Sequence, residues 1–236
     1  MPLEAIILAG GLGSRLRSVV HDRPKVLASI GEKPFLDLLL ENLEKFQQIS
    51  KIVLALGHFS DQIIYYYQNK KFTFPIEYSV ETSPLGTGGA ARLALDKTKQ
   101  EEILILNGDS FIEFNLQNFL DFHQHKKGRG SILLTRVEDV STFGSVVLNE
   151  NQKLIAFEEK GKEGPGLINA GIYLLKKSSL LKWPLGKVLS IEKDILPKLI
   201  TEAPGLYGLH TQTRFIDIGT PSSYQAAQDF FKEPVG

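Results

Sequence analysis

The chain has 236 residues, of which 42% are hydrophobic and 23% charged, the usual balance of a globular protein. Basic and acidic residues both number 27, and the resulting net charge of zero argues against a general nucleic-acid or membrane-surface binder. The absence of cysteine excludes disulfides, thiolate catalysis and cysteine-ligated zinc, and no apolar run approaches the about 18 residues of a transmembrane helix.

Strands and helices are predicted to alternate over the first half of the chain. Short apolar runs predict buried strands at 5–8, 52–56, 76–80 and 103–106. Amphipathic spacing predicts helices at 34–47, 61–68, 90–97 and 116–125. Such alternation predicts a parallel sheet with helices on both faces.

After Gly128 the pattern changes to strand-like segments with few helices between them. These segments are 131–137, 144–148, 154–158 and 167–175. A helix at 192–200, a strand at 215–218 and a helix from 221 to about 231 are predicted to follow. No proline- or serine-rich linker marks a boundary, so we expect a mixed extension of the same sheet and a single domain over residues 1–236.

The first predicted strand runs directly into a glycine-rich loop. Gly10, Gly11 and Gly13 let the backbone turn sharply and let a ligand approach its N–H groups. Two cations follow, Arg15 and Lys25, and the combination favours a polyphosphate site over a tight turn with two solvated cations. The loop has neither the third glycine of the dinucleotide pattern nor the Gly-Lys-Ser/Thr of a P-loop. Hydride transfer and P-loop phosphoryl transfer are therefore disfavoured.

Three loops follow predicted parallel strands, at 9–17, 81–89 and 107–110. Ligands of open parallel sheets bind at the carboxyl ends of the strands. If the strands are neighbours, we expect the three loops to converge on one crevice.

Two acidic residues stand near predicted strand ends. Asp109 follows the strand at 103–106, where a carboxylate serves either as a turn cap or as a metal ligand. Asp217 is flanked by apolar residues on a predicted strand, and buried carboxylates are rarely left unpaired. Two acids near a phosphate loop favour Mg²⁺, which takes one or two carboxylates together with substrate phosphates. A structural ion pair is the alternative for Asp217.

Weaker signals occur in the second half. Glu159 and Asn169 suit sugar hydroxyls, and Lys160 suits a phosphate monoester, although charged residues such as Glu159 and Lys160 are ordinarily a solvated strand end. The five histidines show no metal-ligand spacing. With no basic segment before the first apolar run, we expect a cytoplasmic protein.

Taken together, the ordered motifs resemble those of the sugar-1-phosphate nucleotidyltransferases, also called nucleoside-diphosphate-sugar pyrophosphorylases. The resemblance covers Leu8–Pro34, Ser79–Gly89, Leu106–Asp109, Phe143–Val146, Phe157–Gly161, Leu167–Tyr173 and Phe215–Pro221. Within the family the chain is most similar to the D-glycero-α-D-manno-heptose 1-phosphate guanylyltransferases, through Pro84–Gly89 and Ser190–Asp194 among other features.

The resemblance implies a fold and a set of site residues. The fold is α/β, with a Rossmann-like, mostly parallel mixed sheet flanked by helices, of the nucleotide-diphospho-sugar transferase (GT-A-like) type. Residues 1–127 form its nucleotide-binding half and residues 128–236 its sugar-phosphate-binding half. The implied nucleotide-binding residues are Leu8, Ala9, Gly10, Gly11, Gly13, Ser14, Arg15, Lys25, Glu81, Gly86, Thr87 and Asp109. The implied sugar-phosphate-binding residues are Gly144, Glu159, Lys160, Asn169 and Gly171. Mg²⁺ binds Asp109 and Asp217, and the implied catalytic residues are Arg15, Lys25, Asp109 and Asp217.

The implied reaction transfers a nucleoside monophosphate from a nucleoside triphosphate, GTP by resemblance, to D-glycero-α-D-manno-heptose 1-phosphate. Attack is in line and assisted by Mg²⁺, and pyrophosphate leaves. A sugar phosphate with a second pKa near ~6 is mostly a dianion at neutral pH, so no general base is needed. The partners are these small substrates, with neither nucleic acid nor membrane, and the product is a nucleotide sugar for glycans such as lipopolysaccharide, capsule or S-layer.

Other functions remain alternatives at this point. One is the same reaction on mannose 1-phosphate or another sugar, with UTP, dTTP or CTP as possible donors. Another is a non-catalytic, nucleotide-sugar-sensing subunit, against which the intact Arg15, Lys25, Asp109 and Asp217 argue. For the choice of base, the Glu81 carboxylate could accept hydrogen bonds from both N1 and N2 of guanine. The alternative is that Glu81 is only an exposed charge of its loop.

Overall fold

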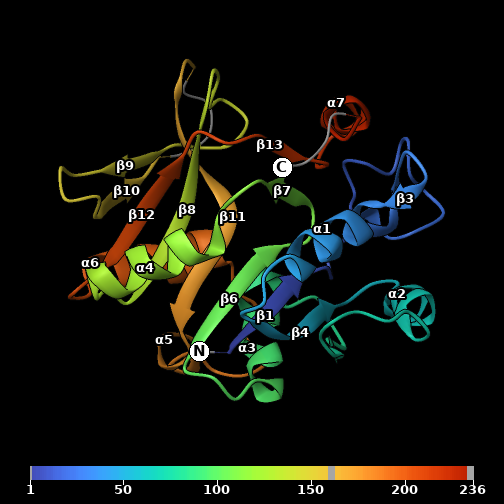
Figure 1. The fold of residues 1–236 in the computed structure, drawn as a ribbon, viewed down its shortest axis with the longest axis horizontal. Coiled ribbons are helices and arrows are strands. Elements are labelled where there is room, and N and C mark those ends of the chain that lie inside the picture. Colours follow the sequence, from blue (N-terminus) through green and yellow to red (C-terminus); the bar gives the residue numbers. More distant parts are fainter. Residues whose placement is uncertain (1, 159–162, 233–236) are drawn as a thin grey trace.

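A seven-stranded sheet forms the centre of the computed structural model, which describes residues 2–158 and 163–232. The strand order is β12-β8-β11-β6-β1-β4-β5 (Figure 1). The strands are β1 (Leu3–Leu8), β4 (Ile49–Leu56), β5 (Ile76–Val80), β6 (Glu102–Asn107), β8 (Gly130–Val137), β11 (Gly166–Lys176) and β12 (Leu206–Thr211). Strands β6, β1, β4 and β5 are parallel neighbours, β12 is parallel to β8, and β11 is antiparallel to β6 and β8. The predicted α/β class and the mixed extension of the sheet are confirmed.

The central strands are apolar on both sides because helices cover both faces of the sheet. In β1, Ile6 packs into one core while its neighbours Ala5 and Ile7 pack into the other, as the two-residue period of a strand requires. All three side chains are fully buried. This is the reason that the part of the first strand from Ala5 to Leu8 is an uninterrupted apolar run.

Helices from distant parts of the chain form the two outer layers. One core receives side chains from α1 (Phe35–Glu44), α2 (Ser60–Tyr67), α4 (Leu116–Lys126) and α7 (Pro221–Phe230). The other core receives side chains from α3 (Gly86–Ala94), α5 (Lys177–Leu181) and α6 (Leu196–Thr201). Figure 1 shows α1 and α4 in front of the sheet. No helix within the described residues is both long enough and apolar enough to cross a membrane.

Three small two-stranded sheets lie outside the main one. They pair β2 (Ser29–Ile30) with β3 (Lys33–Pro34), β9 (Val146–Leu148) with β10 (Leu154–Phe157), and β7 (Ser110–Ile112) with β13 (Phe215–Asp217). The last pair places Asp217 opposite Ser110, just beyond the carboxyl end of β6 (Figure 1). The predicted strand at 215–218 therefore exists, but it joins β7 and not the main sheet.

The helix predicted from Ala90 in fact begins at Gly86, within the second glycine-rich loop. The N–H groups of Gly88 and Gly89 both donate to the carbonyl oxygen of Leu189, at 2.8 and 3.2 Å. A Cβ on Gly89 would lie 2.5 Å from the carbonyl oxygen of Lys187. Close packing on a distant segment thus places glycines in a first helical turn, against their intrinsic helix propensity.

The helix predicted at 192–200 is divided into two parts. A π-helical turn, η3 (Ile191–Ile195), precedes α6. Pro197 lacks an N–H group and cannot supply a regular helical hydrogen bond at this point. Shorter 3₁₀ turns are η1 (Lys25–Leu27) and η2 (Leu95–Lys97).

Candidate functional site

A cavity of about 280 Å³ lies at the carboxyl ends of β1, β5 and β6. Its walls include residues from all three predicted loops, at 9–17, 81–89 and 107–110, so the structure brings these loops together as expected. Ten of the predicted nucleotide-binding residues line it, namely Leu8, Ala9, Gly10, Gly11, Gly13, Lys25, Glu81, Gly86, Thr87 and Asp109.

Glu81 places a half-buried carboxylate in this cavity. A Cβ on Gly57 would lie 2.5 Å from its Oε1, and a Cβ on Gly10 would lie 3.4 Å away. The two glycines therefore make the space that the carboxylate occupies. Burial raises the pKa of Glu81, and the N–H of Leu85, which donates to Oε2 at 3.0 Å, opposes that rise.

Lys25 and Asp109, which also line the cavity, form an ion pair. The Nζ of Lys25 donates to Oδ2 of Asp109 at 2.5 Å, and Ser110 donates its hydroxyl to Oδ1 at 3.3 Å. Gly13 makes room for the lysine, since its φ of +59° suits glycine and a Cβ there would lie 3.1 Å from Cβ of Lys25. No backbone N–H of the described chain donates to the Asp109 carboxylate, which argues against the turn-cap alternative.

Asp217 lies beside Asp109 through the β7–β13 pair. The N–H of Ile218 donates to the Asp109 carbonyl at 2.9 Å. Oδ1 of Asp217 accepts from the N–H of Gly219 at 2.7 Å and from Ser223 at 2.8 Å, while within the described ranges Oδ2 has no hydrogen-bond partner. Nor does a cation of those ranges pair with Asp217, so the structure does not support the ion-pair alternative.

Arg15 and Ser14 are exposed and are not part of the cavity wall. A Cβ placed on Gly219 would lie 3.7 Å from Nη2 of Arg15 and 3.2 Å from Oδ1 of Asp217. The Arg15 guanidinium therefore lies near the turn that follows β13. The two predicted cations thus occupy separate places, Lys25 in the cavity wall and Arg15 near Gly219.

Of the predicted sugar-binding residues, Asn169 and Gly171 lie in an irregular part of β11, where its register with β8 shifts. Oδ1 of Asn169 accepts the N–H of Gly171 at 2.9 Å, and Nδ2 donates to the hydroxyl of Tyr173 at 2.7 Å. Gly171 has a φ of +78°, and a Cβ there would lie 2.8 Å from Nδ2 of Asn107, a cavity-wall residue. This part of β11 therefore packs directly behind the cavity.

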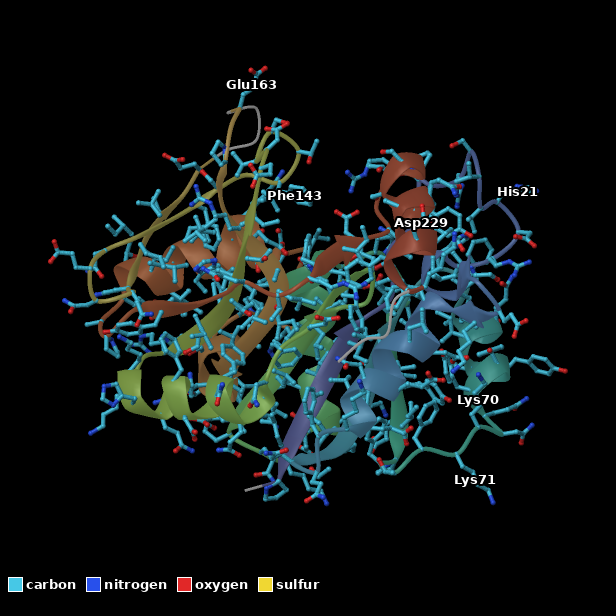
Figure 2. All side chains as sticks on the ribbon, turned by 45° about the horizontal axis from the view of Figure 1, so that its top comes forward. His21, Lys70, Lys71, Phe143, Glu163 and Asp229 are labelled. Carbon is cyan, nitrogen blue, oxygen red and sulfur yellow. The ribbon has the colours of Figure 1, made fainter. Side chains whose placement is uncertain are left out.

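Gly144 lies in the loop between β8 and β9, with a φ of +78° and its N–H donating to Val140 at 3.1 Å. The neighbouring Phe143, labelled in Figure 2, packs edge-on against Phe215 of β13 with ring centroids 6.0 Å apart. This contact ties the Gly144 loop to the strand of Asp217. Glu159 and Lys160 lie outside the described residues.

Two residues near the cavity had no role in the sequence prediction. Asn107 lines the wall, and its Oδ1 is buried without a hydrogen-bond partner among the described residues. Glu192 accepts a hydrogen bond from Thr87 at 3.3 Å. A signal existed for Asn107, which precedes Asp109 by two positions, whereas Glu192 stands in the polar stretch Glu192–Asp194 and has no distinguishing local pattern.

The donor set fits Mg²⁺. Asp109 lines the cavity, Asp217 lies opposite the adjacent Ser110, and one oxygen of Asp217 has no partner in the described structure. The described residues contain no cluster of three or more histidine or acidic side chains that could hold a metal by themselves. Two carboxylates suit a metal that takes its other ligands from substrate phosphates and water.

A family profile, curated relatives and a solved structure all relate this chain to nucleotidyltransferases. The nucleotidyl transferase family profile matches residues 4–233. A D-glycero-alpha-D-manno-heptose 1-phosphate guanylyltransferase of Aneurinibacillus thermoaerophilus is 38% identical over 96% of this chain and 97% of the relative. Mannose-1-phosphate guanylyltransferase 1 of Arabidopsis thaliana is also 38% identical, over 94% of this chain and 63% of the relative. The crystal structure of HddC from Yersinia pseudotuberculosis complexed with GMP-PN is 34% identical, with a TM-score of 0.86 over 97% of this chain and 99% of that one.

Proposed function

Because the chain belongs to the nucleotidyl transferase family, as a sugar-1-phosphate nucleotidyltransferase, we propose that its donor is GTP and its acceptor D-glycero-α-D-manno-heptose 1-phosphate. The observation that supports the donor is the cavity that contains both Glu81 and the Lys25–Asp109 pair. The proposed acceptor is supported by the similarity to the heptose 1-phosphate guanylyltransferase, which this chain matches over nearly its whole length.

The cavity offers separate surfaces for the two ends of GTP. Its Glu81 wall would receive guanine, because a carboxylate can accept from both N1–H and N2–H of that base. The glycine loop would bind the phosphates through N–H groups that no side chain covers, with Gly11 open to the cavity. The ribose would lie near Gly86 and Thr87.

The residues present supply positioning and charge. The acceptor phosphate is a dianion at neutral pH and attacks the α-phosphorus without a general base. Lys25 would neutralise charge at the transferring phosphoryl group, and Arg15 charge on the departing pyrophosphate. A bound Mg²⁺, held by Asp109 and Asp217, would supply further neutralisation of phosphate charge. Asn169, Gly171 and Gly144 would hold the sugar, and Glu159 and Lys160 would bind the sugar and its phosphate.

A second acceptor is mannose 1-phosphate. The observation in its favour is the plant mannose-1-phosphate guanylyltransferase, whose identity to this chain equals that of the heptose enzyme. A non-catalytic sensing role is the more distant alternative, and the Lys25–Asp109 pair at the cavity argues against it.

The test is pyrophosphate release by the purified protein with Mg²⁺, over a matrix of nucleoside triphosphates and sugar 1-phosphates. We expect the highest kcat/KM with GTP and the heptose 1-phosphate. A higher kcat/KM for mannose 1-phosphate would overturn the acceptor, and a preference for UTP, dTTP or CTP would overturn the donor. A protein that binds nucleotide but releases no pyrophosphate with any pair would support the sensing role.

A further inference from the structure

Three segments far apart in sequence meet at the carboxylate of Glu192. Its Oε1 accepts the hydroxyl of Tyr173, from β11, at 2.9 Å. Its Oε2 accepts the hydroxyl of Ser190 at 3.0 Å and that of Thr87, from the first turn of α3, at 3.3 Å. One side chain is therefore bonded to a residue of the cavity wall and to the strand that contains Asn169.

On the β11 side, the bonds fix the side chain of Asn169. The Tyr173 hydroxyl has one proton, which it donates to Glu192, so it accepts from Nδ2 of Asn169 at 2.7 Å. Oδ1 of Asn169 then accepts the N–H of Gly171 at 2.9 Å. The amide of Asn169 has a single orientation as long as Glu192 holds the tyrosine.

On the cavity side, the bonds fix the first turn of α3. The Thr87 hydroxyl accepts the N–H of Ile191 at 2.9 Å while it donates to Glu192. The carbonyl of Leu189, two residues earlier, accepts the N–H groups of Gly88 and Gly89. The segment from 189 to 192 thus holds the helix end that lines the cavity.

Burial keeps the hydroxyl of Tyr173 protonated, so it remains a hydrogen-bond donor. Tyr173 is fully buried, and burial, followed by the charge of Glu192, holds the pKa of its hydroxyl well above the ordinary value. The group stays neutral at any working pH, and water cannot replace either of its partners. Removing the hydroxyl therefore leaves Asn169 without its acceptor.

We propose that Glu192 and Tyr173 are positioning residues that hold Thr87 on the nucleotide side and Asn169 on the sugar side in a fixed relative arrangement. The proposal rests on the proposed function, in which those two residues face the two substrates. The π-helical turn η3 presents Glu192 to both; such turns recur at functional sites. Neither residue needs to touch a substrate.

The two ends of this network can be separated by mutation. Tyr173→Phe removes the bond to Asn169 but leaves Thr87 and Ser190 bonded to Glu192. We expect it to raise the KM for the sugar 1-phosphate roughly tenfold, the effect of one lost buried hydrogen bond, and to leave the KM for GTP within about twofold. Glu192→Ala should raise both KM values, and Glu192→Gln, which keeps one acceptor oxygen, should give intermediate values.

Tyr67→Phe is the matched control. Tyr67 is also buried, and its hydroxyl donates to the buried carboxylate of Asp37 at 2.7 Å. Tyr66 and Lys70 also bond Asp37, and Figure 2 shows Lys70 far from Phe143, which packs against the strand of Asp217. This variant loses the same kind of bond away from the cavity, so we expect a similar loss of thermal stability and unchanged KM values.

Wild-type turnover is measured first with the substrate matrix, and GTP binding is measured for every variant by calorimetry. Wild-type inactivity with all pairs would refute the proposed function alone. The positioning role would be overturned if Tyr173→Phe changed KM values no more than Tyr67→Phe does. It would also be overturned if Glu192→Ala bound GTP as tightly as the wild type.

Discussion

At the scale of single residues, the two cations of the first loop are not equivalent. Lys25 is bonded to Asp109 inside the cavity, and its position depends on the missing side chain of Gly13. Arg15 is exposed and lies near Gly219, outside the cavity wall. A sequence motif presents both as loop cations, but the structure places them in different surroundings, which is why we propose separate roles for them.

Arg15→Ala should lower turnover by roughly a hundredfold or more, as the loss of a donor that stabilises the transition state does. Steady-state pyrophosphate release with saturating substrates measures this effect. Arg23→Ala is the control, because Arg23 is an exposed cation of the same region that pairs with its neighbour Asp22. Near-normal turnover of Arg15→Ala would rule out the role proposed for Arg15.

Glu81→Gln should reduce the preference for GTP over UTP and dTTP, because an amide presents one acceptor where the carboxylate presents two. Burial raises the pKa of Glu81, so the carboxylate should take up its proton at a higher pH than an exposed glutamate does. The KM for GTP should therefore rise as the pH falls through that raised pKa. Substrate competition at several pH values measures both effects, and an unchanged base preference in the variant would refute the hypothesis.

At the scale of elements, apolar runs predicted the central strands well, because burial on both faces leaves their middle positions apolar, as in Ala5–Leu8 and Ile103–Leu106. Contacts between segments distant in sequence determined the elements that apolar runs did not predict, such as the first turn of α3. Gly86–Gly89 form a helical turn because Leu189 accepts the N–H groups of Gly88 and Gly89. Strand β12 includes Gly208, and this glycine weakens the strand pattern of its sequence. A glycine is needed there because a Cβ would lie 2.5 Å from Cδ1 of Leu134.

The glycines of the two loops should respond differently to alanine. Gly89→Ala forces a Cβ against the carbonyl oxygen of Lys187 and should cost about 1–3 kcal/mol of unfolding free energy. A Cβ on Gly11 would meet no heavy atom within 4 Å, so Gly11→Ala should keep its stability within about 0.5 kcal/mol. If the phosphates of GTP lie against this backbone, Gly11→Ala should nevertheless raise the KM for GTP. Urea denaturation and kinetics together test this, and a normal KM for Gly11→Ala would remove Gly11 from the phosphate site.

At the scale of the whole molecule, the strand order creates the site. Because β6, β1, β4 and β5 are parallel neighbours, their carboxyl ends share one edge, and the predicted convergence of the loops follows. The motifs predicted which residues meet there, including Lys25 and Asp109. They did not predict the β7–β13 pairing that brings Asp217 to Asp109, nor the bonds of Glu192, because both depend on partners about 100 residues away. Local sequence patterns contain no information on such pairings.

A buried histidine of α4, which contacts two strands of the same sheet, should make the stability of the whole molecule depend on pH. His123 of α4 is 3% exposed, and its ring nitrogens lie 2.9 Å from Oγ of Ser131 and 3.2 Å from Oε1 of Glu102. Burial lowers the pKa of His123 below its ordinary value of 6.5, with Lys176 acting in the same direction and the charge of Glu102 opposing it. Between the lowered folded-state pKa and pH 6.5, the unfolded chain therefore binds a proton that the folded protein does not bind.

The free energy of unfolding should consequently fall as the pH drops from 6.5 toward the folded-state pKa of His123, by at most about 1.4 kcal/mol per pH unit. Above pH 6.5 both states are neutral at this position, and the contribution to pH dependence vanishes. His123→Gln keeps a polar side chain without a titrating ring, so its urea midpoint should vary less between about pH 7.5 and 5.5 than that of the wild type. If both proteins lost stability equally on acidification, the pKa of His123 would be the same in the folded and unfolded chains, and the charge of Glu102 would fully offset the cost of burial.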